Sequence, residues 1–319
     1  MAPASLLCPV CGGGTHARFH ALYDDRYGYP DRFDLMECGA CGHLYVPAQF
    51  APEELGKLYT DYYPRGNFDL DSFSPETEKA GFSSWLNGDR GSAFRWIPCN
   101  VRVLDIGCGI GATLAYHKQR GCEAYGIEAD GNVQPIARRY GLEIRQGIFD
   151  GTQFESGYFD YVTLDQVAEH VTDPNALMRG VARVLKPGGK VVITTPNPNS
   201  AGARLFGRKW LNWHIPYHLQ FYTKRSLRKV AEQAGLKLVG AKTVTASEWQ
   251  YYQWLHAALF PGHGQRSVFW SDGVASRPIP SLLRVIIGVA RRLRLQGWIS
   301  RLLDGLGAGD NFVFVLQKP

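Results

Sequence analysis

The stretch that decides the fold is VRVLDIGCGIGA, residues 101–112. A β-branched, apolar run ends in the carboxylate of Asp105 and then breaks into glycines at the alternate positions 107, 109 and 111. The residues that follow, 113–119, are compatible with a helix. A buried strand that feeds a glycine-rich turn at a helix N-terminus brings backbone amides close to a nucleotide-like ligand. The stretch therefore predicts a site for such a ligand at the edge of an open α/β sheet.

Strand and helix patterns alternate on both sides of this turn. Strands are expected at 101–106, 123–128, 143–145, 159–164, 190–195, 236–244 and 311–316, and helices at 111–120, 132–140, 173–185 and 224–235. This alternation predicts a doubly wound, mostly parallel sheet, and therefore an α/β fold. Sheets of this kind bind ligands beyond the carboxyl ends of their strands.

Length and composition count against several classes of protein. The chain has 319 residues, 45% of them hydrophobic, and a net charge of only +6. A protein that binds a nucleic-acid groove would carry denser clusters of Lys and Arg. The N-terminus has no signal-peptide pattern, and no run approaches the ~20 apolar residues of a membrane-spanning helix. We therefore expect a cytoplasmic protein whose cysteines are mostly reduced or metal-bound.

Two Cys-x-x-Cys pairs stand near the N-terminus. Cys8 and Cys11 form the first pair, Cys38 and Cys41 the second, and a glycine follows each pair. Four thiolates suit a tetrahedral zinc site that is structural, because no coordination position stays open for catalysis. The alternative is a redox dithiol, although such motifs come singly within a βαβ pattern. We expect a zinc ribbon over residues 1–48 that braces or covers the main domain, or recognises nucleic acid.

The rest of the chain divides into three parts. Residues 49–100 form a connector, with helical pieces that include Tyr62, Tyr63 and the stretch 74–86. The main domain is expected at 101–246 plus 307–319, with a helical lid inserted at 247–306. Within the lid, the basic stretch 282–303 has Leu282, Val285, Ile286, Val289 and Leu293 on one helical face and Arg284 and Arg291 opposite. This face packs on the domain in the first interpretation. In the second interpretation, residues 280–305 contact the inner face of the membrane or admit a lipid-linked acceptor.

The glycine turn by itself fits two cofactors. It satisfies the G-x-G-x-x-A pattern, and Glu128 follows about 20 residues later, as in dinucleotide-binding proteins. Asp105 discriminates between them, because a carboxylate at the strand end repels a pyrophosphate and favours a ligand with an ammonium or sulfonium group. S-adenosylmethionine has both groups. A purely structural role for Asp105, bonded to the turn itself, is the other interpretation.

Further motifs carry a family resemblance. They are YGIE at 125–128, FDYV at 159–162, EHVTDP at 169–174 and VLKPGG at 184–189. With the glycine turn, they make residues 101–245 resemble class I S-adenosylmethionine-dependent methyltransferases of the ubiquinone-biosynthesis O-methyltransferase type. The cysteine pairs are similar, more loosely, to the zinc ribbon of some sugar C-methyltransferases. The resemblance implies a Rossmann-like, seven-stranded sheet with an N-terminal zinc ribbon and a helical insertion before the last strand.

The resemblance also implies roles for individual residues. The methionine part of the cofactor would lie against Asp105, Gly107, Cys108, Gly109 and Gly111, the ribose against Glu128 and Ala129, and the methionine carboxylate or sulfonium near Asp165 and Gln166. Many relatives carry an acid after the third strand to bind the adenine, but this chain reads QGIFD at 146–150. Either Ile148 and Phe149 sandwich the adenine or Asp150 supplies the acid.

Catalysis requires a base only when the acceptor must lose a proton. The candidates are Glu169 and His170 after the fourth strand, and His214 and His218 in the segment 210–219, where this fold places its acceptor-binding insertion. Trp210 and Trp213 would form a flat apolar wall beside them. Structural roles remain open for each histidine, with His170 bracing the next helix and His218 anchoring its loop on Phe221. Glu169, His170 and a loop histidine could also bind a divalent ion.

The sequence thus predicts an S-adenosylmethionine-dependent methyltransferase acting on a hydroxyl, or a carbon, of a small molecule or a glycan- or lipid-linked precursor. One alternative is a zinc-ribbon methyltransferase or binding protein for nucleic acid, against which the mild charge counts. The other is an NAD-dependent oxidoreductase, which Asp105 disfavours.

Overall fold

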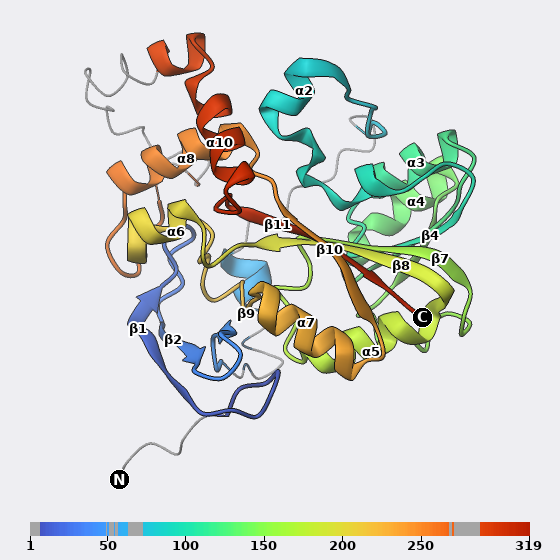
Figure 1. Cartoon of the computed structure of the whole chain (residues 1–319), viewed down its shortest axis with the longest axis horizontal. Coiled ribbons are helices and arrows are strands. Elements are labelled where there is room, and N and C mark those ends of the chain that lie inside the picture. Colours follow the sequence, from blue (N-terminus) through green and yellow to red (C-terminus); the bar gives the residue numbers. More distant parts are fainter. Residues whose placement is uncertain are drawn as a thin grey trace.

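A seven-stranded sheet forms the centre of the computed structural model, which describes residues 7–48, 50, 54, 57–62, 73–267, 270 and 288–319. The strand order is β10-β11-β8-β7-β4-β5-β6 (Figure 1). The strands are β4 (Arg102–Ile106), β5 (Glu123–Glu128), β6 (Glu143–Gln146), β7 (Phe159–Asp165), β8 (Leu185–Pro196), β10 (Lys237–Thr243) and β11 (Asn311–Gln317). β4 to β8 pair in parallel, and β11 is antiparallel to both of its neighbours. The predicted mostly parallel, seven-stranded α/β sheet is confirmed.

Helices cover both faces of this sheet (Figure 1). α5 (Pro174–Val184) and α7 (Lys224–Gln233) pack on the face to which Leu104 and Ile106 of β4 point. α3 (Ala112–Gln119) and α4 (Gln134–Tyr140) pack on the other face, where Val103 points. The alternation along β4 is the period of two expected of a strand that is buried on both sides.

Local signals explain where these helices begin. The Asp173 carboxylate accepts hydrogen bonds of 2.9 Å from the amides of Asn175 and Ala176, and Pro174 occupies the first helical position of α5. Thr223 and Ser226 form a reciprocal capping box at the start of α7. The helices predicted from these segments are therefore present at the expected places.

The N-terminal ribbon has a sheet of its own, in the order β1-β2-β3-β9. Its strands are β1 (Thr15–Tyr23), β2 (Arg32–Cys38), β3 (Leu44–Tyr45) and β9 (Gln220–Phe221). The last strand comes from the main domain, and its Phe221 pairs with Leu44. The ribbon is therefore joined to the main domain by backbone pairing as well as by side-chain packing.

The connector and the insertion differ in part from the prediction. Only α2 (Gly81–Asn87) forms within the helix expected at 74–86, because Ala80 is extended and Gly81 takes a φ of +81°. Tyr63 and residues up to 287 of the predicted amphipathic helix lie outside the described residues. Beyond 287, Arg294 (φ +53°) separates the helical residues 288–292 from α10 (Leu295–Gly305). The other helices are α6 (Ala201–Phe206) and α8 (Ser247–Ala258).

In the described part of the chain, none of the helices has the length and apolar character needed to cross a membrane.

Candidate cofactor and acceptor site

The glycine turn lies at the carboxyl end of β4, between β5 and β7. Gly107, Gly109 and Gly111 all have positive φ values, of 71°, 52° and 83°. A Cβ at Gly107 would lie 2.6 Å from Val167 Cγ2, and one at Gly111 would lie 2.7 Å from Leu142 Cδ1. Glycine is therefore required at these two positions both by backbone conformation and by close packing.

Gly109 differs from the other two glycines. Apart from Gly109 itself and its two chain neighbours, none of the described residues has an atom within 4 Å of the position that its Cβ would occupy. The turn consequently presents bare backbone to open space at this point, which is what close approach of a ligand requires.

Asp105 is buried at the end of β4 and points into the protein. Its two carboxylate oxygens accept hydrogen bonds from the hydroxyls of Thr113 (2.5 Å) and Thr163 (2.7 Å). Burial raises the pKa of this carboxyl to about 6, although both threonines oppose the shift. Asp105 thus fastens α3 to β7, as the structural interpretation anticipated, and its contact with a cofactor remains a prediction.

Glu128, at the end of β5, faces the same turn. Its carboxylate accepts hydrogen bonds of 3.0 Å from the amides of Gly109 and Asp130. The next residue, Ala129, is exposed. Cys108 is buried behind the turn, where its sulfur would lie 2.5 Å from a Cβ at Gly126. Cys108 therefore contributes packing, and Glu128 is the one of these three residues whose side-chain oxygens accept hydrogen bonds at the turn.

The two residues of the predicted adenine sandwich differ in exposure. Ile148 is 79% exposed, but Phe149 packs in the main core against Gly180 of α5. Phe149 thus fills the space between α5 and the sheet, and its contact with an adenine stays a prediction. Asp150 is exposed and accepts hydrogen bonds from the amide and hydroxyl of Thr152.

Asp165 and Gln166 end β7 beside the glycine turn. The Asp165 carboxylate accepts hydrogen bonds from the Thr194 hydroxyl and from the Ala93 amide (3.1 Å). Burial raises its pKa. Gln166 is exposed and has a φ of +56°, an unfavourable value for a residue with a side chain. The connector therefore reaches the carboxyl edge of the sheet through Ala93, and Gln166 projects from that edge.

The four candidate catalytic residues come together, although two loops carry them. Leu219 and Gln220 donate backbone hydrogen bonds of 2.7 and 2.9 Å to the carbonyl of Glu169, which joins the two loops. The ring centres of His170 and His218 lie 4.8 Å apart, and those of His214 and His218 lie 4.9 Å apart. One potential ligand atom from each of Glu169, His170 and His218 lies within 4.8 Å of the others.

Hydrogen bonds define the tautomers of two of these histidines. Nδ1 of His170 lies 2.9 Å from the carbonyl of Tyr217, and Nδ1 of His218 lies 2.9 Å from the carbonyl of Asn212. A carbonyl can only accept, so each Nδ1 carries the proton and each Nε2 carries the lone pair. Both rings thus anchor their loop and keep a basic nitrogen.

Burial determines the charge of the cluster. It lowers the pKa of His170 to about 4, and it lowers the pKa values of His214 and His218 well below 6.5. Burial also raises the pKa of Glu169 to about 8. At neutral pH the cluster therefore holds neutral imidazoles beside a protonated carboxyl group.

The tryptophans do not form the predicted wall. Trp210 and Trp213 are almost fully buried, with ring centres 4.8 Å apart, in the core between the ribbon and the main domain. Sequence reasoning instead missed Arg26 and Tyr27, which come from the ribbon. Tyr27 lies edge-on to His214 at 5.7 Å, and Arg26 donates a hydrogen bond of 2.6 Å to the carbonyl of Leu211. The loop after β1 has no motif that would have indicated this contact.

A family model described as "Methyltransferase domain" matches residues 65–241, more than half of the chain. The chain belongs to this methyltransferase family. Its activity is S-adenosylmethionine-dependent methyl transfer.

Curated relatives of this methyltransferase include two ubiquinone biosynthesis O-methyltransferases. The one from Xanthomonas axonopodis pv. citri is 29% identical over 48% of this chain and 70% of its own length. The one from Xanthomonas oryzae pv. oryzae is 30% identical over 47% of this chain and 68% of its own length. Among solved structures, a 1,6-didemethyltoxoflavin-N1-methyltransferase from Burkholderia thailandensis aligns with 86% of this chain and 95% of its own, with a TM-score of 0.45 and 14% identity.

The carboxyl edge of this methyltransferase fits its cofactor. The open space over Gly109 admits a ligand against bare backbone, and the Glu128 carboxylate beside it can accept hydrogen bonds from vicinal hydroxyls. When bound, S-adenosylmethionine supplies an electrophilic methyl group on a sulfonium.

The four ribbon cysteines of the methyltransferase converge on one point. The sulfurs of Cys8 and Cys41 lie 3.7 Å apart, and those of Cys11 and Cys38 lie 3.5 Å apart. Zn–S bonds of about 2.3 Å place tetrahedral sulfurs about 3.8 Å apart, so the spacing fits a zinc ion. Gly12 and Gly42 follow the pairs with φ values of 69° and 67°, which gives both turns the same left-handed conformation.

Proposed function

We propose that this methyltransferase acts on a hydroxyl group of a small molecule or of a glycan- or lipid-linked precursor, with a carbon as the alternative acceptor atom. The named relatives are O-methyltransferases, which supports oxygen as the acceptor atom. The observation that carries the proposal is the joining of the 165–170 and 210–221 loops, which sets imidazole nitrogens next to the end of β7.

A histidine of this cluster acts as the base. An acceptor hydroxyl becomes nucleophilic enough for an in-line displacement when its proton passes to a nearby neutral imidazole. His170 and His218 satisfy this requirement, because Nδ1 is anchored on a carbonyl and Nε2 carries a lone pair. His214, packed between Tyr27 and His218, is the third candidate.

The ribbon holds a structural zinc ion in this proposal. All four donors are thiolates, so the ion has no open position for chemistry. The zinc ion fixes β2 and β3. Because Leu44 of β3 pairs with Phe221, the ion also fixes the loop that carries His218.

Turnover of single histidine variants tests the proposed base. Acceptors are first screened with a labelled methyl donor, and S-adenosylhomocysteine is titrated against NAD to verify the cofactor. His170→Ala, His214→Ala and His218→Ala are then compared with His16→Ala, whose ring is exposed on β1. We expect a decrease in kcat of about 10²–10⁴-fold in at least one of the three, with no change in His16→Ala. Unchanged kcat in all three variants contradicts a histidine base.

A further inference from the structure

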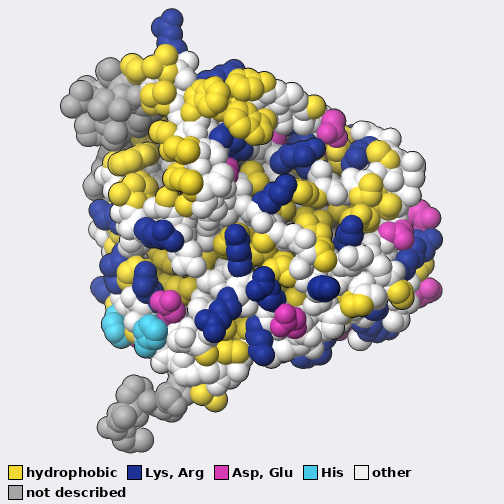
Figure 2. Space-filling view, viewed as in Figure 1, with side chains coloured by type: hydrophobic (Ala, Val, Ile, Leu, Met, Phe, Trp, Pro, Cys, Tyr) yellow, Lys and Arg dark blue, Asp and Glu magenta, His cyan; other side chains and the backbone are white. Residues whose placement is uncertain are grey.

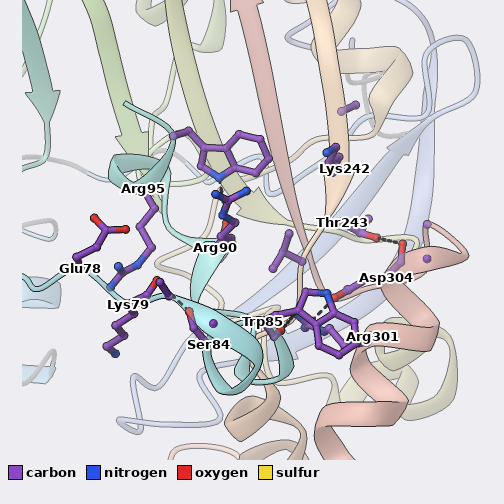
Figure 3. A pocket seen from close by; sticks show the side chains of 18 of the residues that line it. Glu78, Lys79, Ser84, Trp85, Arg90, Arg95, Lys242, Thr243, Arg301 and Asp304 are labelled. Carbon is purple, nitrogen blue, oxygen red and sulfur yellow. Dashed lines mark hydrogen bonds and ion pairs between the residues drawn. The ribbon is translucent and has the colours of Figure 1, made fainter. Parts of the chain in front are cut away.

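A large pocket opens beside β10, away from the histidine cluster. It has a volume of about 770 Å³ and lies between α2, the 88–96 segment, the end of β10 and the end of α10 (Figure 3). Its lining contains six basic residues and two acidic ones. The basic residues are Lys79, Arg90, Arg95, Lys224, Lys242 and Arg301, and the acidic ones are Glu78 and Asp304.

Half of this positive charge has no acidic partner. Arg301 pairs with Asp304 at 2.8 Å, Arg95 with Glu76 at 3.7 Å and Lys79 with Asp89 at 3.9 Å. Over the described parts of the chain, no carboxylate lies within ion-pair distance of Arg90, Lys224 or Lys242. A site with uncompensated cations from several elements attracts an anionic group.

Exposed aromatic rings stand next to the pocket. Phe82, Trp85 and Trp298 are 59%, 50% and 50% exposed, and their ring centres lie 5.6 to 6.0 Å apart. We call these three residues the aromatic triad. Trp85 lines the pocket as well, so the apolar and the cationic surfaces share one border.

The triad is held in place by the packing of α2 against α10. Gly297 packs closely on Leu86, since a Cβ built on Gly297 would lie 2.7 Å from the Cγ of Leu86. Arg301 donates a hydrogen bond of 2.9 Å to the carbonyl of Trp85. The two helices therefore present one fixed surface, although about 200 residues separate them in the chain.

The apolar surface continues along α10. Leu295, Trp298, Ile299, Leu302 and Leu306 are all exposed and recur at helical spacing, whereas Gly297 and Ser300 are buried on the opposite side. Arg291, Arg292 and Arg294 precede this stripe and are exposed. Figure 2 shows hydrophobic side chains gathered over α10 above a group of Lys and Arg side chains. Contiguous apolar surface of this kind marks an interaction site.

We propose that this face docks on a bilayer that contains anionic phospholipids. The α10 stripe and the aromatic triad enter the interfacial region, where Trp is favoured, and the pocket receives a phosphate headgroup. Charge complementarity favours this occupant, since a purely apolar partner would not use the unpaired cations of the pocket. The docking does not depend on the acceptor or on the proposed base.

Co-sedimentation of the full chain with vesicles tests the proposal. The vesicles are phosphatidylcholine with or without phosphatidylglycerol. We expect the chain to sediment with the anionic vesicles and not with phosphatidylcholine alone, and added salt to weaken the binding. Leu302→Asp and Trp298→Ser should abolish sedimentation, and Lys242→Ala and Arg90→Ala should each weaken binding about fivefold.

Matched controls separate docking from folding and from general charge. Leu205→Asp introduces the same acid at an exposed leucine on α6, and Lys237→Ala removes the same charge at the other end of β10. Both should bind like the parent, and circular dichroism should show that every variant is folded. The proposal is overturned if the parent does not sediment with anionic vesicles, or if the α10 and pocket variants bind as well as their controls. Equal binding to both vesicle types also overturns the headgroup assignment.

Discussion

Replacement of Glu169 by Gln tests how the acceptor site controls its charge. Gln has nearly the same shape as Glu but does not titrate. The Glu169 side chain is fully buried, and neither of its oxygens has a hydrogen-bond partner that meets normal geometry within the described residues. Such a carboxyl group avoids ionisation, which is why its pKa rises. The substitution should therefore change how stability depends on pH.

The magnitude follows from the two pKa values. The pKa is 4.5 in an unperturbed chain and about 8 in the folded protein. Between these values the folded protein binds one proton more than the unfolded chain, so the free energy of unfolding falls by about 1.4 kcal/mol per pH unit. The slope lessens as the folded pKa is approached, so the loss from about pH 6 to about pH 8 is roughly 2 kcal/mol. Glu169→Gln should lack this loss.

Urea denaturation at several pH values between these limits measures the effect, without added divalent ions. The other titrating groups are the same in both proteins, so they cancel in the difference. Glu155→Gln is the control, because Glu155 is exposed. Its profile should parallel that of the parent. If the Glu169→Gln profile is also parallel to the parent, Glu169 is ionised in the folded protein and the charge assignment for the cluster is wrong.

Four further outcomes are expected. Asp105→Asn should weaken binding of S-adenosylmethionine more than that of S-adenosylhomocysteine in calorimetric titrations, because only the first carries the sulfonium charge; equal losses would assign Asp105 a structural role alone. Gly107→Ala should destabilise the protein by about 1–3 kcal/mol in thermal unfolding, because Gly107 has a positive φ and a Cβ there would lie 2.6 Å from Val167. Adding Val167→Ala to this variant should recover only the part of the lost stability that comes from the steric clash. Elemental analysis of the parent should find about one zinc ion per chain, and Cys38→Ser should lower both this zinc content and the melting temperature. Cys99→Ser, at an exposed thiol outside the ribbon, should change neither. Burial lowers the pKa of His170 to about 4, so kcat/KM should stay constant when the pH is lowered from neutral to about 6. A decline with an apparent pKa of about 6.5 would indicate a solvent-exposed base.

The local chemistry of the chain was predictable from sequence. The turn at 107–111 needs glycines because its φ values are positive, and the glycines at alternate positions are enough to indicate such a turn. The cysteine pairs at 8–11 and 38–41 are similarly local, since each pair and its following glycine form one turn. Strand and helix periodicity then placed the carboxyl edge of the sheet, and with it Asp105, Glu128 and Asp165.

What only the tertiary structure decided is which distant side chains meet. From sequence, Phe149 and Trp213 were expected to contact a ligand. In the structure, Phe149 packs against α5 and Trp213 packs beneath the ribbon. Arg26 of the ribbon reaches the histidine loop, and β9 of the main domain extends the ribbon sheet. Periodicity determines which face of an element is apolar. It does not determine what covers that face, because the covering depends on packing between segments far apart in the chain.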